Sequence, residues 1–175
     1  MTTTPLRFGL PFIIIFIVLT GAFEASRGSA FERFLVEDVI LVPTTALINA
    51  LTPGEHVQLV GRTLVSAGGS RLHVTRGCEG IEMFLLLIAA ILAFPAGLQQ
   101  RLQGLLAGLL LAYLLSVARL AALHYTLQYS PAAWEILHGF LLPLGPIALL
   151  ALFFMRWSSR ISSDGDTVKT DVRVA

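Results

Sequence analysis

Long apolar runs constrain this chain more than any other feature of its sequence. A segment that crosses the hydrocarbon core of a bilayer needs about 20 mostly apolar residues. The first run carries no charge and is flanked by Arg7 and Glu24. The runs are Phe8 to Phe23, Met83 to Gln100, Leu102 to Ala118 and Ile136 to Met155. They predict a small polytopic membrane protein.

The composition supports this interpretation and excludes several functions. Of 175 residues, 55% are hydrophobic and 13% are charged, whereas a soluble domain carries about a quarter charged residues. The net charge of +1 gives no reason to expect a nucleic-acid partner. There is no Gly-rich phosphate loop, zinc-type Cys or His spacing, or G-x-S-x-G elbow. The single Cys excludes an internal disulfide framework.

The runs predict transmembrane helices at 7–24, 79–98, 103–127 and 136–156. We expect the first to be an uncleaved span rather than a signal peptide, because Phe23-Glu24-Ala25 is a poor cleavage site. Residues 31–51 are apolar but contain Glu37, Asp38 and Pro43. Charged groups are costly inside a bilayer, so an interfacial or partly re-entrant helix is expected there. A fifth span is the alternative.

Residues 55–76 differ in kind from the rest of the chain. Apolar residues alternate there with polar ones around Ala67-Gly68-Gly69-Ser70, which predicts two short strands joined by a turn. The apolar positions are Val57, Leu59, Leu64, Leu72 and Val74. The polar tail 158–175 is expected to be disordered. The fold class is thus a single all-α polytopic domain over 1–175, with about four to five transmembrane helices and a small extracytoplasmic β-hairpin.

Basic residues in short loops favour the cytoplasmic side of a membrane. Arg101 lies in a short connection, and Arg156 and Arg160 follow the last run. Placing these residues in the cytoplasm directs the hairpin outward. The hairpin itself contains Arg62, Arg71 and Arg76, which weakens the argument from charge.

Three residues with reactive or charged side chains share one face of the predicted bundle. Cys78 precedes the second span, Arg119 lies near the end of the third, and His138 lies near the start of the fourth. The order of the last three spans places them on the same side of the membrane, whichever side that is. Each alone has a simpler interpretation: a packing Cys, an Arg that reaches lipid phosphates, or an interfacial His.

Together, these three side chains contain the parts for acyl transfer through a thioester. A nearby cation lowers the pKa of a thiol, which makes Cys78 a nucleophile. Arg119 has the permanent charge and the N–H groups that stabilise an oxyanion. His138 has the acid–base range needed to protonate a departing amine. His124, five residues beyond Arg119, is an alternative to His138.

Neighbouring residues suit supporting roles. Gly77 and Gly80 flank the thiol and allow a substrate backbone to approach closely. Glu82 lies one helical turn after Cys78, where it either orients a partner or pairs with Arg76. Ser116, one turn before Arg119, can help to position the guanidinium. His56 and His73 fall in the predicted hairpin, where surface roles are expected.

The segments RGCEGIEMFLLLIAAILAFPA, SVARLAALHY and WEILHG together resemble the exosortase/archaeosortase family of membrane-embedded cysteine transpeptidases. That family carries a Cys-x-x-Gly-like or Cys-x-Gly motif that opens a span, an Arg at the outer end of the next and a His that opens the last. Cys78, Arg119 and His138 match in order and spacing. The resemblance covers about Leu72 to Trp157 and extends to compact exosortases of Gram-negative bacteria, such as exosortase H or M.

The resemblance implies a function. Such enzymes cleave exported proteins that bear a C-terminal tripartite signal of the PEP-CTERM type, which combines a short motif, a hydrophobic span and a basic tail. They transfer the new C-terminus to an acceptor, and no metal or cofactor is implied. The location implied is the bacterial inner membrane, with the active site facing the periplasm. In this family Asn often lies three residues before the Arg, whereas this chain has Ser116.

Two other functions remain open at the level of the sequence. A non-enzymatic scaffold or transporter subunit would tolerate changes at Cys78, Arg119 and His138 apart from effects on stability. An intramembrane protease of another chemistry would rely on Ser116 or Ser130 and would survive loss of the only thiol.

Overall fold

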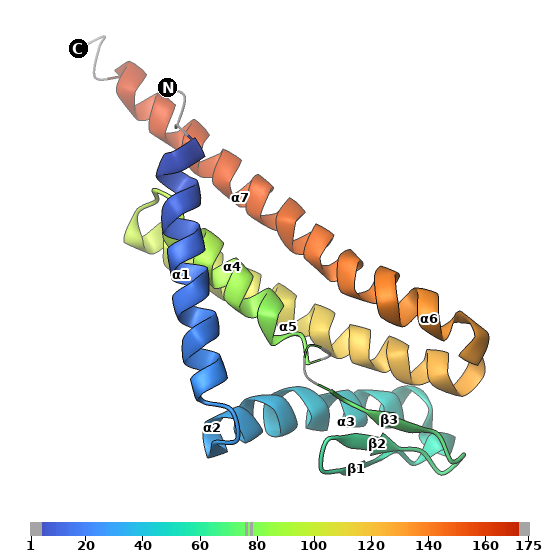
Figure 1. Ribbon diagram of the computed structural model, residues 1–175. Coiled ribbons are helices and arrows are strands. Elements are labelled where there is room, and N and C mark those ends of the chain that lie inside the picture. Colours follow the sequence, from blue (N-terminus) through green and yellow to red (C-terminus); the bar gives the residue numbers. More distant parts are fainter. Residues whose placement is uncertain (1–4, 76, 78, 172–175) are drawn as a thin grey trace.

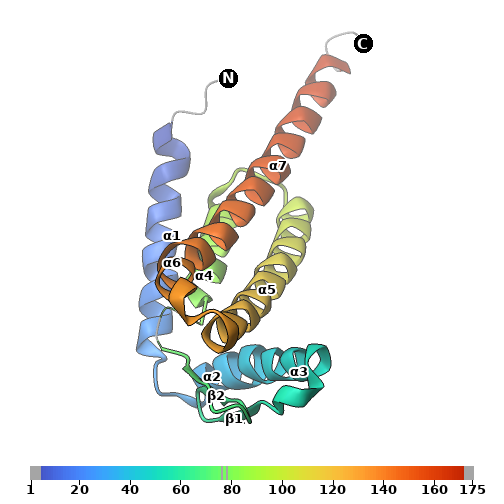
Figure 2. The same ribbon diagram turned by 90° about the vertical axis from the view of Figure 1, so that its right-hand side faces the viewer.

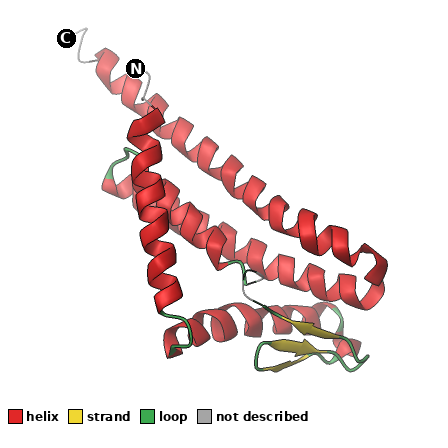
Figure 3. Cartoon of the chain, in the orientation of Figure 1, coloured by secondary structure: helices red, strands yellow, loops and turns green. Residues whose placement is uncertain are grey.

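The computed structural model describes residues 5–75, 77 and 79–171. Helices form most of this part of the chain, and one small sheet lies at one end (Figure 3). Four helical segments are long and apolar enough to cross a membrane: Phe8–Ala25, Ala30–Leu51, Leu98–Tyr129 and Pro131–Ser162. The apolar runs predict a mostly helical, polytopic fold class. The helices of the structure agree with this prediction in their length and composition.

The bundle consists of α1 (Pro5–Ala25), α4 (Ile81–Ala93), α5 (Leu98–Tyr129) and α7 (Leu142–Asp171). Helix α4 contacts the other three (Figure 1). The ring of Phe8 lies 6.4 Å from that of Phe94 and 5.8 Å from that of Phe154. Phe23 and Ile81 line a common cavity. The end of α4 therefore lies near Phe8, and its beginning lies near Phe23. We call these the terminal end and the sheet end of the bundle.

A further helical segment crosses the sheet end. It consists of α2 (Ala30–Arg33), η1 (Phe34–Leu41) and α3 (Val42–Leu51), which follow one another without a break. Figures 1 and 2 show that it lies across the end of α1 rather than alongside it. The sequence predicts an interfacial or partly re-entrant helix here, with a fifth span as the alternative. The segment is long and apolar enough to span.

Two widened helical turns precede prolines. The π-helical segments η1 and η4 (Leu137–Leu141) each end two residues before a proline, Pro43 and Pro143. Proline lacks the N–H of the regular i→i−4 bond, and its ring pushes on the carbonyl four residues earlier. The N–H groups of Val42 and Leu142 accordingly reach back five residues. His138 therefore lies in a widened turn, a feature that often occurs at functional sites.

The sheet has one strand more than the predicted hairpin. Strands β1 (Gln58–Val60), β2 (Thr63–Val65) and β3 (Arg71–His73) pair antiparallel in that order. The predicted turn around 67–70 joins β2 and β3. The additional strand is separated from β2 only by Gly61 and Arg62, and Gly61 adopts a φ of 58°. A two-residue turn with positive φ makes such a hairpin possible. Leu64 and Leu72 are buried, as the alternation predicts.

Helix α4 is shorter than the span predicted over 79–98. It ends at Ala93, and Phe94 is extended with a ψ of 135°. Pro95 explains this, because proline disfavours the helical conformation of the residue before it. At 1.5 Å per residue, α4 is about 20 Å long, less than the hydrocarbon thickness of about 30 Å. The next helix, α5, is longer than the predicted 103–127.

The last helical segment is also longer than predicted. The short elements η3 (Pro131–Ala133) and α6 (Trp134–Ile136) lead through η4 into α7, so helix begins before residue 136. Helix α7 then continues to Asp171, where a disordered tail over 158–175 was expected. Propagating an existing helix adds one hydrogen bond per residue, and no proline follows Pro146 to stop it.

One face of α5 allows the other helices to approach closely. Gly104, Gly108, Ala112 and Ser116 recur every four residues and are buried. A Cβ added at Gly108 would lie 2.8 Å from Leu87 Cδ2 on α4 and 2.9 Å from Phe153 Cε1 on α7. Stripes of small residues are typical of helix packing in membranes. This stripe sets how closely α4 and α7 pack against α5.

Candidate functional site

Cys78 and Arg76 lie outside the described residues, so the site is built from their neighbours. Gly77, Glu79 and Gly80 belong to the connection that leads from β3 into α4. Glu79 directly follows the candidate nucleophile, and its side chain is only 1% exposed. The side chains that bind Glu79 therefore determine the path of this connection.

Two arginines from distant segments bind the Glu79 carboxylate. Nη1 of Arg27 donates to Glu79 Oε2 at 3.3 Å, and Nη1 of Arg62 donates to Oε1 at 3.1 Å. Arg27 follows α1, and Arg62 lies in the turn between β1 and β2. The connection into α4 is thus attached to both the bundle and the sheet.

Further carboxylates pair with these two arginines. Arg62 Nη2 lies 3.0 Å from Glu32 Oε1, and Arg27 Nη1 lies 3.3 Å from the same oxygen. The backbone N–H of Gly28 donates to Glu32 Oε2 at 2.6 Å. On the exposed side, Arg27 also pairs with Glu24 at 2.9 Å. We call Glu24, Arg27, Glu32, Arg62 and Glu79 the carboxylate–arginine cluster.

The cluster is electrostatically demanding. Burial raises the pKa of the Glu79 carboxyl above its ordinary value of 4.5, although Arg27 and Arg62 oppose that shift. A buried charge is tolerated only where partners satisfy it. Removal of a single member therefore leaves uncompensated charge in the interior, which is the costly way to break a buried ion pair.

The sequence alone did not identify this cluster as a unit. Arg27 and Glu79 are separated by 52 residues and Arg62 and Glu79 by 17, so no helical or strand periodicity relates them. The available signal was the position of Glu24, Arg27 and Glu32 between two apolar runs. Charges at such a boundary are ordinary, and their convergence depends on the tertiary fold.

Gly80 and Ser116 lie in direct contact. Gly80 caps α4 with a φ of 80°, and a Cβ placed on it would lie 2.9 Å from Ser116 Oγ. Only glycine adopts this conformation readily, and only glycine leaves room for the hydroxyl. Ser116 Oγ is buried without a hydrogen-bond partner among the described residues. Arg119 is buried three residues further along α5.

His138 lies on the segment that packs against this helix. Element η4 contacts α5, and the His138 ring stacks on Trp134 with centroids 4.9 Å apart and planes 10° apart. Trp134 and Leu142 pack against the apolar core that contains Ile81 and Leu120. Gly80, Arg119 and His138 therefore lie at the sheet end of the bundle. Arg119 and His138 thus share one end, as predicted, whereas Cys78, the third residue of that prediction, lies outside the described residues. Glu82 is exposed.

His124 has other partners, which argues against it as the alternative to His138. Its side chain is completely buried, and Nε2 bonds to Glu55 Oε2. The hydroxyl of Tyr129 donates to Glu55 Oε1 at 2.6 Å. Glu55 belongs to η2 (Pro53–Glu55), so this group fastens the entrance of the sheet to the end of α5. An ionised carboxylate is acceptor-only, hence His124 Nε2 is the donor.

The burial and hydrogen bonds of Glu55 should make the stability of the protein depend on pH. Burial opposes ionisation, but hydrogen bonds from His124 and Tyr129 outweigh it and hold the pKa of Glu55 below 4.5. A carboxylate with a lowered pKa stabilises the folded state above its ordinary pKa, and this contribution disappears as the pH falls. At pH 7, Glu55→Gln should therefore lower the free energy of unfolding by about 1–3 kcal/mol.

The measurement is thermal unfolding in detergent micelles, followed by far-UV circular dichroism at pH 7 and at successively lower pH. The difference between native protein and Glu55→Gln should shrink as the pH falls below about 4.5. Glu135→Gln, which removes an exposed carboxylate, serves as the control and should have little effect. A difference that stays constant with pH would contradict this account of Glu55.

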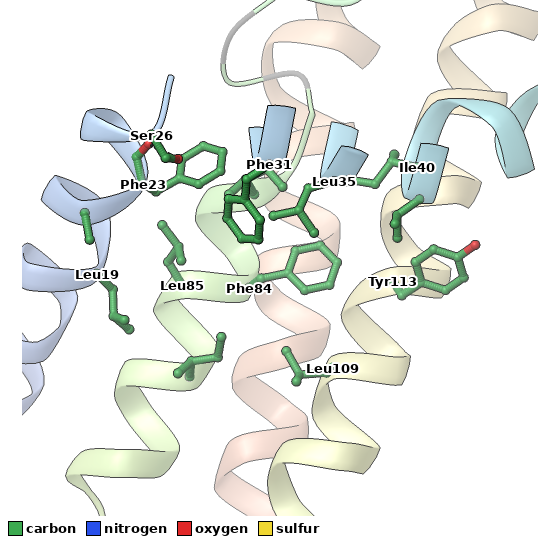
Figure 4. A pocket seen from close by; sticks show the side chains of 14 residues that line it. Leu19, Phe23, Ser26, Phe31, Leu35, Ile40, Phe84, Leu85, Leu109 and Tyr113 are labelled. Carbon is green, nitrogen blue, oxygen red and sulfur yellow. Dashed lines mark hydrogen bonds between the residues drawn. The ribbon is translucent and has the colours of Figure 1, made fainter. Parts of the chain in front are cut away.

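An apolar cavity of about 400 Å³ adjoins the carboxylate–arginine cluster. Its walls come from α1, α4 and α5, and the crossing segment α2–η1 covers its sheet end. Figure 4 shows Phe31 and Leu35 of that segment directed toward Phe84 of α4. The Arg27 guanidinium lies 4.9 Å from the centre of the Phe23 ring, which lines the cavity. Apolar and charged surfaces thus meet at this point.

The described residues contain no group of three or more His, Cys, Asp or Glu side chains that could hold a metal ion. The arrangement instead brings an arginine, a histidine and a buried hydroxyl to the end of the bundle at which the Cys78 connection enters α4. Comparison of the chain with protein-family models, with curated proteins and with solved structures finds no match.

Proposed function

We propose that this protein is a membrane-embedded cysteine transpeptidase of the exosortase type. It would cleave C-terminal sorting signals of exported proteins at the extracytoplasmic face of a bacterial inner membrane. One observation carries the proposal: the residues that follow Cys78 are anchored against α5 one turn from Arg119. Glu79 is bound by Arg27 and Arg62, and Gly80 contacts Ser116.

The reaction begins with the Cys78 thiolate. Its sulfur attacks the scissile carbonyl carbon, a C–S bond forms, and the carbonyl electrons move onto oxygen. Arg119 stabilises first the thiolate and then this oxyanion. The oxyanion collapses, the C–N bond breaks, and His138 donates the proton that the departing amine needs. The C-terminal fragment leaves with the signal's hydrophobic span.

The thioester is then resolved. An acceptor nucleophile, or water, attacks the same carbonyl carbon, and the C–S bond breaks to restore the thiolate. His138, now neutral, accepts the proton of the attacking group. The stacked Trp134 ring limits the orientations that His138 can take. The apolar cavity beside the cluster offers a surface for part of the signal's hydrophobic span.

The test is mass spectrometry of the C-terminal peptides of exported proteins. Cells that express native protein are compared with cells that express Cys78→Ala, and Ser130→Ala is the control for a serine-based mechanism. We expect a set of proteins to keep its hydrophobic tail only in Cys78→Ala. Tails that are removed equally in both strains would exclude the thiol mechanism. Tails that persist in Ser130→Ala alone would favour the serine alternative.

A further inference from the structure

A second cavity, at the terminal end of the bundle, differs in character from the first. Its volume is about 360 Å³, and it lies between α5 and α7. Gln100 and Gln103 line it from α5, and Arg156, Trp157 and Arg160 line it from α7. The apolar cavity at the sheet end contains no charged residue, so the two cavities suit different ligands.

The two arginines give this cavity a positive charge. Arg156 and Arg160 are four residues apart on α7, which places them on the same helical face. Both are exposed, and neither forms an ion pair with the side chains described for residues 8–75, 77 and 79–162. Their guanidinium groups are therefore available to an anion.

The wall behind the arginines is fixed by packing. A Cβ added at Gly104 would lie 2.6 Å from the Trp157 ring, so the ring rests directly on the α5 backbone. The Trp157 ring also packs against Phe94 and Phe154, with centroids 5.4 Å and 5.8 Å away. The cavity is thus formed by the folded helices before any ligand arrives, which reduces the cost of binding.

We propose that this cavity binds the phosphate of an anionic phospholipid headgroup. Guanidinium groups match phosphate oxygens in geometry and charge, and the glutamine amides add neutral donors. Basic cavities between transmembrane helices on the cytoplasmic side bind such headgroups in other membrane proteins. The proposal does not depend on the transpeptidase activity.

The surroundings favour a lipid over free phosphate. Leu102 and Leu106 on α5 are 52% and 73% exposed, and Met155 on α7 is 56% exposed. These side chains lie within a few residues of Gln103 and Arg156, where the acyl chains of a bound lipid would continue. Tryptophan is also enriched at the level of lipid headgroups, which agrees with Trp157 in the cavity wall.

The experiment uses Trp157 as its reporter. The chain has two tryptophans, so Trp134→Phe leaves Trp157 as the only one. The full chain with this change is reconstituted in phosphatidylcholine vesicles, and brominated phosphatidylglycerol or brominated phosphatidylcholine is titrated in. Bromine quenches tryptophan fluorescence on contact. We expect half-maximal quenching at about a tenfold lower mole fraction of the anionic lipid.

Two variants test the assignment to the arginines. Replacing both Arg156 and Arg160 by Gln should abolish the preference for the anionic lipid. Arg101→Gln should retain it within about twofold, because Arg101 lies at the same end but donates to the Phe94 carbonyl at 3.1 Å and does not line the cavity. Circular dichroism confirms that each variant is folded.

Three outcomes would overturn the proposal. Equal quenching by the two lipids in the Trp134→Phe protein would show that the cavity does not select an anionic headgroup. An equal loss of preference in Arg101→Gln would indicate a general surface charge effect. Inorganic phosphate that changes Trp157 fluorescence in phosphatidylcholine vesicles, without any preference among lipids, would identify a site for the free anion instead.

Discussion

Replacing Glu79 by alanine should lower the free energy of unfolding by about 3 kcal/mol. Loss of one partner from a buried ion pair costs about 3–5 kcal/mol, because the remaining charge is left without compensation. Here two guanidinium groups lose a ligand together, at 3.3 Å for Arg27 and 3.1 Å for Arg62. We place the effect at the lower end of that range because each arginine keeps Glu32.

The measurement is the thermal unfolding midpoint in detergent micelles, with Glu82→Ala as the matched control. Glu82 is exposed and only three residues away, so its loss should cost less than about 0.5 kcal/mol. Because Cys78 is the only thiol, its alkylation rate gives a second readout, which should rise in Glu79→Ala and not in Glu82→Ala. Equal effects of the two substitutions would show that the cluster does not hold the connection into α4.

Gly108→Leu should destabilise the bundle to a similar extent, by about 3 kcal/mol. A Cβ at this position would already lie within 3 Å of Leu87 on α4 and of Phe153 on α7. Overpacking of this kind typically costs about 1–3 kcal/mol. Leucine adds three carbons beyond the Cβ, so α4 and α7 must both move away from α5. Gly108→Ala should cause a smaller loss.

Gly21→Leu is the control, because a Cβ at Gly21 of α1 meets nothing within 4 Å. Thermal unfolding of the three glycine variants in the same detergent should give losses in the order Gly108→Leu, Gly108→Ala, Gly21→Leu. If the thermal unfolding midpoint of Gly108→Leu equals that of the native protein, then α4 and α7 do not pack closely against this stripe. The proposed cleavage activity should fall along with stability, since this stripe continues to Ser116 beside Gly80.

Local chemistry explains what could be predicted from the sequence. The hydrocarbon thickness makes the length of an apolar run informative, so the helices predicted over 7–24 and 103–127 lie close to α1 and α5. The helix predicted over 136–156 instead continues well past its predicted end, to Asp171. For residues 31–51, Glu37 and Asp38 favour an interfacial or partly re-entrant helix, because charges are costly inside a membrane, and this stays a prediction. Pro95 was present in the sequence and explains why α4 ends early, although hydropathy alone extended that span to 98.

The order of the apolar runs also predicted which candidate residues share one end of the bundle. Arg119 and His138 lie there together in the structure, because helices joined by short connections alternate in direction. Cys78 lies outside the described residues, and its neighbour Gly80 lies at the same end. The contact between Gly80 and Ser116 could not be predicted from the order of the runs. The alternating direction of successive helices identifies a shared end of the bundle. Only the packing of α4 on the small-residue face of α5 brings two particular residues together.

The sequence by itself determined a helical chain suited to a membrane, the position of the small sheet and the end at which Cys78, Arg119 and His138 are expected. Only the tertiary structure decided that Arg27 and Arg62 bind Glu79, and that Glu55 engages His124. The physical reason is the range of each effect. Apolar length and turn chemistry act within a few neighbouring residues, whereas an ion pair depends on the distance between atoms that the chain brings together from 52 residues apart.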